Sequence, residues 1–431
     1  MNRKQLTLIF LALVIVGSAG LVLINRNKDS WSAPQGKMGL KLFPNFTNLD
    51  DVVAIHLKDA GDLHLAAKDG TWRVRERNDY PADFSQIKEL MDKLAGLKIS
   101  QSQPIAASQL ARMQLEPPGK GTNSAILAEF LDKQGKPLHA VLLGKKHTEE
   151  SARPSPFGGG EFDNGRYVML PEDTQNLLLV PDPLSSIETS PESWLDKDFF
   201  KIDKIKSVSL LSTNATNSWK LTRESEDAPW VLDATNAGEM LDSNKVSSLG
   251  SALSYASFLD VASNTAPAAT GLDKPLALTL ATFDHFTYDI KVGGKTPENN
   301  NLYLTVAVAA DIQTNRPAAA TEKPEDKQKL DAEFQAKTKA LQEKLAKEKA
   351  LGQWVYVVSS MQVDPLIRER SQLLVDKKED KPAGNTGAEP GAEPKPAAVE
   401  TPGLPAVPAS APAATNTPPG ATNTPPAEPP K

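Results

Sequence analysis

Downstream of residue 50, the chain alternates apolar and polar residues in short segments. The alternation runs through "VVAIHL" (52–57) and "DLHLAAK" (62–68), and Asp69-Gly70 then precedes "TWRV" (71–74). Period-two alternation around glycine turns is typical of β-hairpins with one buried face. The sequence therefore predicts three antiparallel strands in this region.

The period then changes to that of a helix. Asp83 or Ser85 can cap its start, and the apolar residues that follow share one face: Ile87, Leu90, Met91, Leu94 and Leu97. Two more strands, "SAILAEFL" (124–131) and "LHAVLLG" (138–144), are joined across turn residues 132–135, and "GRYVML" (165–170) adds another. This pattern predicts an α+β unit with an antiparallel, meandering sheet and one main packed helix.

The same order of segments occurs again about 150 residues later, a spacing longer than that of solenoid repeats. The second series contains "IKSVSLL" (205–211), "APWVL" (228–232) and "SNKVSSLGSALSYASF" (243–258). Matched positions keep a nearly constant spacing: Trp72 with Trp230, Ile87, Leu90 and Leu94 with Val246, Leu249 and Leu253, and "LEPPG" (115–119) with "LDKPL" (272–276). We therefore expect two tandem repeats of one fold, residues 51–203 and 204–376.

The end of the second repeat departs from this spacing. Tyr167-Val168 is matched with Tyr356-Val357, which implies an insertion of about 316–352 that is helical by composition. Pro324 suits the first turn of this helix. Its apolar stripe is narrow: Leu330, Phe334, Leu341 and Leu345. Two interpretations stay open, a charged arm lying on its own sheet or a coiled-coil contact with a partner or a second copy.

The N-terminal segment, residues 1–28, contains an apolar run from Leu6 to Ile24 without a charged residue. Its length suffices for a transmembrane helix, which needs about 20 residues. A cleaved signal peptide is the alternative, since Gly17-Ser18-Ala19 offers small residues, but the apolar run continues past them. Because the five-residue basic tail before the run should stay in the cytoplasm, we expect an inner-membrane anchor with the bulk of the chain outside.

The rest of the organisation follows from composition. Residues 29–50 form a juxtamembrane linker, and 377–431 are rich in proline and alanine and contain no aromatic residue. Such a segment buries too little apolar surface to fold, so we expect a disordered tail. The formal net charge of −6 gives no basic footprint for nucleic acid. The absence of cysteine excludes disulfides, thiolate metal sites and a cysteine nucleophile.

Gly294-Lys295-Thr296 resembles the end of a phosphate-binding loop. A P-loop needs glycine at position 289, where the chain has Asp289, and it must open a helix, whereas Pro297 follows directly. Gly144-Lys145 occupies a similar place in the first repeat. We therefore interpret the glycine–lysine pair as a strand-ending turn used once per repeat and expect no nucleotide.

The sequence contains no recognisable catalytic, cofactor or metal site. None of the five histidines has tight metal spacing, although His56 and His64 lie in adjacent predicted strands and fit a polar cross-strand pair. Glu149, Glu150 and Asp163 lie near a Gly-rich segment interpreted as a hairpin connection, with a binding loop as the alternative. Trp72 and Trp230 are interpreted as core residues. We thus expect no cofactor and no enzymatic activity.

The chain resembles a bacterial family known as a domain of unknown function, DUF4340. The shared motifs are "GTWRV", "YPADFSQIKELMDKLAGLK", "LEPPG", "VLLGKK" and "GRYVMLPED", and the resemblance extends from Leu42 to Val375 over both repeats. "LDKPL" and the helical insertion depart from the pattern. The resemblance implies a membrane-anchored extracytoplasmic protein and an accessory role, since some members are encoded near ABC-transporter components of the gliding-motility type.

The expected function is that of a scaffold or accessory protein of the bacterial envelope, whose partners are the membrane and a protein, for example transporter subunits. Two other classes stay open. An enzyme acting on envelope polymers predicts an acidic cluster in a cleft of one repeat, and the tail favours a cell-wall-binding module.

Overall fold

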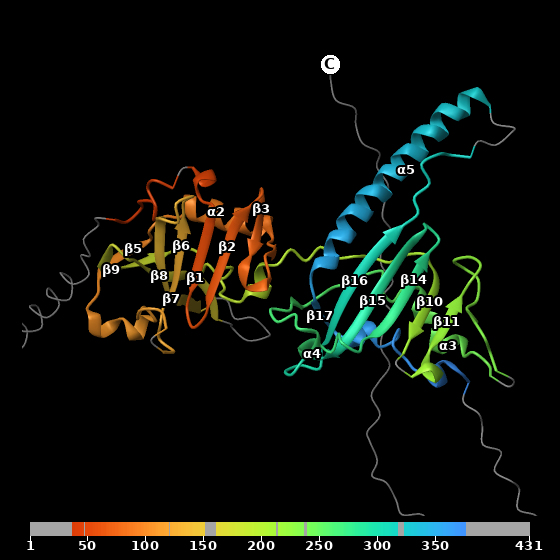
Figure 1. The fold of residues 1–431 in the computed structure, drawn as a ribbon. Helices are drawn as coiled ribbons and strands as arrows, with labels where there is room; N and C mark the ends of the chain where they lie inside the picture. The colour runs from red at the N-terminus through yellow and green to blue at the C-terminus, as the bar shows by residue number, and fades with distance from the viewer. Residues whose placement is uncertain are drawn as a thin grey trace, which may run out of the picture. The chain divides into compact units, whose positions relative to one another are not determined.

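The computed structural model describes residues 37–375 except 47, 120, 151–160, 213, 237–238 and 318–322. The predicted anchor, the proline-rich tail and residues 29–36 and 47 of the predicted linker lie outside these residues. The rest of the predicted linker is described, and it packs against the first half, where Leu42, Phe43 and Phe46 are buried. None of the described helices is long and apolar enough to span a membrane. The described part of the chain contains two antiparallel sheets with few helices, as Figure 1 shows.

The first sheet contains nine strands in the order β4-β3-β2-β1-β6-β7-β8-β9-β5. The elements of this half are β1 (Ala54–Lys58), β2 (Asp62–Lys68), β3 (Thr71–Val74), β4 (Tyr80–Pro81), α2 (Phe84–Gly96), β5 (Gln101–Pro104), β6 (Ile126–Leu131), β7 (Pro137–Glu150), β8 (Glu161–Leu170) and β9 (Asp173–Val180), with short 3-10 turns η1 (Leu49–Asp51), η2 (Arg75–Arg77), η3 (Ala107–Gln109), η4 (Ala111–Met113) and η5 (Pro191–Trp194).

The second sheet contains eight strands in the order β12-β11-β10-β14-β15-β16-β17-β13. Its elements are β10 (Ile205–Leu211), β11 (Trp219–Thr222), β12 (Val231–Leu232), α3 (Ser243–Val246), β13 (Asp260–Val261), α4 (Pro267–Thr270), β14 (Leu276–Thr282), β15 (Phe286–Lys295), β16 (Leu302–Ala310), α5 (Pro324–Ala350), β17 (Tyr356–Val358) and α6 (Ser360–Val363), with 3-10 turns η6 (Ala215–Asn217), η7 (Ser247–Gly250), η8 (Leu351–Gln353) and η9 (Arg370–Leu373).

The two strand orders are the same once β1 is matched with β10. The strands β3, β2, β1, β6, β7, β8, β9 and β5 then correspond to β12, β11, β10, β14, β15, β16, β17 and β13, and β4 has no counterpart among the described residues. A register shift also recurs at one place, between Leu143 and Lys146 of β7 and between Val292 and Lys295 of β15. Shared order and a shared bulge position fix which residues are equivalent.

Each half also closes in the same way. The backbone N–H of Asp83, which caps α2, donates to the carbonyl of Trp194, and the N–H of Asp242, which caps α3, donates to the carbonyl of Leu373. Isolated bridges beside these contacts join Ala82 to Leu195 and Leu241 to Leu374. The segment after each sheet therefore returns to the start of that sheet's helix.

Most predicted strands agree with the structure, and the helix α2 buries the predicted face: Ile87, Leu90, Met91 and Leu94. The helix of the second half is shorter than α2, since α3 ends at Val246 and the 3-10 turn η7 that follows it ends at Gly250. Serine, asparagine and glycine are poor helix formers, and the Ser247 hydroxyl donates to the carbonyl of Asn244. Val246, Leu249 and Leu253 are nevertheless buried like their counterparts.

Two of the residue matches between the halves are wrong, and the first concerns Tyr167. Tyr167 lies in β8, whose counterpart is β16, so its equivalent is Tyr303 and not Tyr356. The helical insertion therefore follows the strand equivalent to β8. The match of Tyr167-Val168 with Tyr356-Val357 is wrong because a Tyr-Val pair also begins β17, the next strand after β16 along the chain.

The glycine match is displaced by one residue. The bulge positions pair Gly144 with Gly293, not with Gly294. A Cβ on Gly144 would lie 2.5 Å from the Met113 carbonyl oxygen, and one on Gly293 would lie 2.3 Å from the Thr270 carbonyl oxygen. These glycines therefore allow a strand to pass close against a connecting loop. The interpretation as strand-ending turns is wrong for β7, which continues to residue 150.

Candidate functional site

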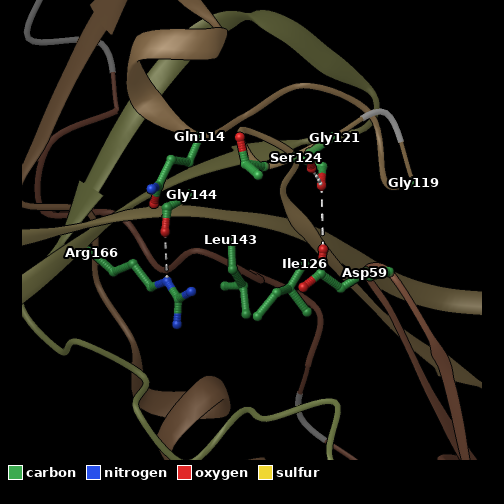
Figure 2. A pocket seen from close by; sticks show the side chains of 11 residues that line it. Asp59, Gln114, Gly119, Gly121, Ser124, Ile126, Leu143, Gly144 and Arg166 are labelled. Carbon is green, nitrogen blue, oxygen red and sulfur yellow. Dashed lines mark hydrogen bonds between the residues drawn. The ribbon is translucent and has the colours of Figure 1, made fainter.

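A pocket of about 610 Å³ lies on the first sheet, where β6, β7 and β8 meet the loop that follows η4. Figure 2 shows Arg166 and Asp59 at its two ends, with Leu143 and Ile126 between them. The lining residues are Asp59, Ala60, Gln114, Gly119, Gly121, Thr122, Ser124, Ile126, Leu143, Gly144 and Arg166.

The loop above the pocket is an addition to the shared fold. Leu115 and Leu272 both pack against the equivalent glycines, but the chain needs seven more residues to reach β6 in the first half than β14 in the second. This longer loop supplies Gly119, Gly121, Thr122 and Ser124 of the lining. The two glycines adopt φ angles of 79° and 118°, which residues with a Cβ rarely adopt.

The backbone at the base of this loop is strained. Gln114 has a φ of 52°, whereas Gly271, at the same place before the equivalent leucine, has a φ of 69°. A left-handed conformation costs a residue with a side chain about 1 kcal/mol. Strain of this kind gathers at functional sites. The pocket wall of the first half thus contains a glutamine in a strained backbone conformation. The second half has Gly271 at this position, and glycine adopts such a conformation without strain.

Arg166 is the charged residue at one end of the pocket, and only 8% of its surface is exposed. Its Nε donates to the Gly144 carbonyl at 2.9 Å, and its Nη1 donates to the carbonyls of Leu184 at 3.3 Å and Pro183 at 3.4 Å. Within the described residues Nη2 has no hydrogen-bond partner, and no carboxylate forms an ion pair with the guanidinium. Burial lowers the pKa of Arg166, and the charge of Asp163 opposes this effect.

The fold itself does not require an arginine at this position. Arg166 pairs with Lys146 just beyond the bulge and with Val180 of β9. At the same register of the second sheet, Leu302 pairs with Lys295 and Val358, and Leu302 is 6% exposed. A buried charge without a counter-ion is costly. Its presence in one half only therefore indicates a role beyond packing.

Asp59 provides the opposite charge at the other end. The Ser124 hydroxyl lies 3.3 Å from Asp59 Oδ1 and 2.7 Å from the Gly121 carbonyl, to which it can donate instead. No described cationic side chain forms an ion pair with Asp59. The described lining contains no histidine that could act as a base for Ser124 or Thr122. The arrangement is suited to holding a polar ligand by charge and hydrogen bonds.

The histidines singled out from the sequence lie elsewhere on the first sheet. His56 and His64 are direct cross-strand partners, as predicted, and their rings stack at 4.2 Å. His64 Nδ1 contacts Glu76 at 2.7 Å, and His56 Nδ1 contacts Glu129 at 3.3 Å. Within the described residues no group of three such side chains is placed to hold a metal ion.

The remaining candidates are structural where they are described. Lys295 is exposed in β15, and the N–H of Thr296 donates to the Asn301 carbonyl in a hairpin turn. No helix begins there, so the geometry of a phosphate-binding loop is missing. Asp163 pairs with Lys146 at 3.0 Å, and the Asn164 amide donates to Glu149. The glycines of the Gly-rich segment, 158–160, lie outside the described residues.

Arg166, Asp59 and Gln114 did not stand out in the sequence. One signal was available for Arg166, because it shares the period-two face of β8 with Val168 and Leu170, all three of them buried. A charge in phase with core positions indicates a buried polar site. Asp59 and Gln114 carry no such signal, since only the fold brings them together.

Comparison with known proteins identifies one family. Residues 72–275 match the model of the Domain of unknown function (DUF4340). No match was found among curated proteins or among solved structures. The single match begins in β3 and ends one residue before β14, so it runs across both halves and does not confirm two tandem copies of the family domain. The chain is a DUF4340 domain-containing protein.

Proposed function

We propose that this protein is a membrane-anchored extracytoplasmic scaffold of the bacterial envelope, built by duplication of one sheet fold and serving a protein partner such as transporter subunits. The observation that carries the proposal is the shared strand order of the two sheets. The motifs that mark the family resemblance have packing roles: Trp72 and Leu115 are buried, and Gly144 accommodates a close backbone contact. Packing roles for these motifs favour a scaffold that presents binding surfaces over an enzyme.

Helix α5 of the second half offers a surface for a partner. Helix α5 has no counterpart among the described residues of the first half, and its C-terminal part packs against the second half. Glu348, 4% exposed, accepts hydrogen bonds from the Tyr288 hydroxyl at 2.7 Å and the Lys201 N–H at 3.1 Å. Leu341 and Leu345 pack against the core. Of the two interpretations of this helix, the contacts support the arm on its own sheet.

The outward side of α5 remains free for a partner. Its side chains are exposed and charged, with Lys329 paired to Glu333 and Lys339 to Glu343 at 3.9 Å each. Exposed pairs of this type contribute only about 0.3–0.5 kcal/mol to a helix, so they can exchange partners at little cost. We infer that the protein partner contacts this side of α5.

Crosslinking tests the proposal. A photoreactive amino acid at Ala336, exposed on α5, is compared with one at Lys133, exposed in the β6–β7 turn. Full-length protein is irradiated in cells and purified from membranes. We expect a specific protein adduct at position 336, such as a transporter subunit, and much less adduct at position 133. Equal labelling at both positions would contradict a partner surface on α5.

The other function classes have their own outcomes. Recovery of glycan or wall peptides in place of a protein would favour a cell-wall-binding module, and turnover of an envelope polymer by the purified chain would favour an enzyme. Removal of residues 1–28 is the control for anchoring, and we expect it to move the protein from the membrane fraction to the soluble fraction. Retention in the membrane fraction would contradict the anchor.

A further inference from the structure

We propose that the pocket on the first sheet binds a short zwitterionic peptide, with its carboxylate at Arg166 and its amine at Asp59. This inference does not depend on the scaffold role. It rests on two charges of opposite sign at the ends of one pocket, neither of which forms an ion pair with another described residue.

The Arg166 end is suited to a carboxylate. The three carbonyl contacts fix the guanidinium plane through Nε and Nη1, and they leave the N–H groups of Nη2 without a partner among the described residues. Hydrogen bonds between arginine and a carboxylate combine charge with fixed geometry. A bound carboxylate would also neutralise a guanidinium whose hydrogen-bond partners among the described residues are all carbonyls.

The Asp59 end is suited to an amine. Asp59 is half-buried beside the β1–β2 turn, and its described neighbour is the neutral hydroxyl of Ser124. A carboxylate here disfavours a multiply charged anion such as phosphate, because like charges in a shared pocket repel. It favours a ligand that carries a positive group away from its carboxylate.

The middle of the pocket sets the size of the ligand. Leu143 and Ile126 provide an apolar wall between the charged ends. Gln114 and Thr122 add polar groups to the lining. A volume of about 610 Å³ lies within the range of small-molecule sites. The pocket is therefore suited to a short peptide with small side chains.

The second half shows what the same fold looks like without this site. Leu302 replaces Arg166, and Ser212, the first residue after β10, replaces Asp59, the first residue after β1. The loop that covers the pocket is also missing there. Both charges and the loop thus occur together in one half, as expected if they serve one ligand.

Calorimetric titration of the full-length protein tests the proposal with four probes: alanyl-alanine, its N-acetyl form, its C-terminal amide and inorganic phosphate. The variants R166L and D59S adopt the second half's residues, so the fold should accept them. The control K146Q removes a nearby cation that does not line the pocket, and circular dichroism confirms folding of each variant.

We expect wild-type protein and K146Q to bind alanyl-alanine and to bind the acetylated and amidated forms more weakly. R166L should lose about tenfold or more in affinity for the dipeptide, the effect of losing a charge-assisted hydrogen bond. D59S should remove the preference for the dipeptide over its acetylated form.

Three results would overturn the proposal. The first is that folded wild-type protein binds none of the three organic probes. The second is that R166L binds the dipeptide as tightly as the wild type, which would make Arg166 a purely structural clamp. The third is tighter binding of phosphate than of the dipeptide, which would show a simple anion site.

Discussion

The two sheets share one strand order but differ in what has been added to it. The first half carries a longer loop, a buried arginine and a pocket. The second half has a buried leucine at the arginine position and carries the helix α5 between β16 and β17. The difference separates residues that recur in both halves, and so belong to the shared fold, from residues that are found at the equivalent positions of one half only.

The largest expected effect comes from exchanging the residues at the equivalent position of β8 and β16. L302R buries a guanidinium in a core without the carbonyl cradle that surrounds Arg166, and we expect it to lower the free energy of unfolding by about 3–5 kcal/mol. R166L loses only hydrogen bonds to carbonyls, which predicts a cost of about 1–2 kcal/mol. Urea unfolding of the two variants measures the difference.

Equal costs for the two exchanges would mean that the surroundings of Arg166 and Leu302 are alike. Leu302→Met is the control for the second sheet. It keeps an apolar side chain of similar volume and should cost less than about 1.5 kcal/mol.

A smaller effect tests which glycines are equivalent. G293A places a Cβ 2.3 Å from a carbonyl oxygen, and G144A places one at 2.5 Å, so both must displace a loop. We expect each to cost about 3 kcal/mol in the free energy of unfolding. G294A is the matched control, because its Cβ would find the nearest atom at 3.6 Å, an ordinary contact.

Thermal or urea unfolding of the three alanine variants decides between the two alignments. A cost at Gly294 as large as that at Gly293 would restore the match of Gly144 with Gly294.

The smallest expected effect concerns the contacts by which the segment after each sheet returns to the start of that sheet's helix. In the first half the returning segment is fixed by Trp194, which is fully buried and donates from Nε1 to the Glu188 carbonyl at 2.7 Å. In the second half, Arg370 Nη2 donates to Glu239 Oε2 at 2.8 Å. This bond, with further bonds from Asn236, lowers the pKa of Glu239 from its ordinary 4.5 to about 2.

A carboxylate whose pKa is lowered by folding stabilises the folded state above its ordinary pKa, and this contribution is lost as the pH falls toward the folded value. We therefore expect acid between about pH 4.5 and pH 2 to loosen the closure of the second half before that of the first. Hydrogen exchange at Asp242 and Asp83, compared at both ends of this range, measures the two closures.

E239Q serves as the control, because it removes the titrating group and should abolish the difference in pH response between the two closures. Equal loosening of both closures in wild-type protein would show that the ion pair does not set the acid response.

Much of the fold could be predicted from the amino-acid sequence. Alternation located β1, β2 and β3, apolar spacing located α2 with its cap at Asp83, and composition located α5. These predictions are correct because each depends only on residues that are close together in the sequence. The matches that failed, Tyr167 with Tyr356 and Gly144 with Gly294, concern short patterns that recur by chance, and hydrogen-bond register alone distinguishes them.

By itself, the sequence determined the α+β character of the chain, the repeated series of strands and the packing role of its tryptophan Trp72, since hydrophobic period and turn residues act locally. Only the tertiary structure decided that Asp59, Gln114 and Arg166 line one pocket. These residues lie on a turn, a strained loop and a strand far apart in sequence. Their proximity follows from the pairing of β1 with β6 and of β7 with β8, which is a long-range property of the sheet.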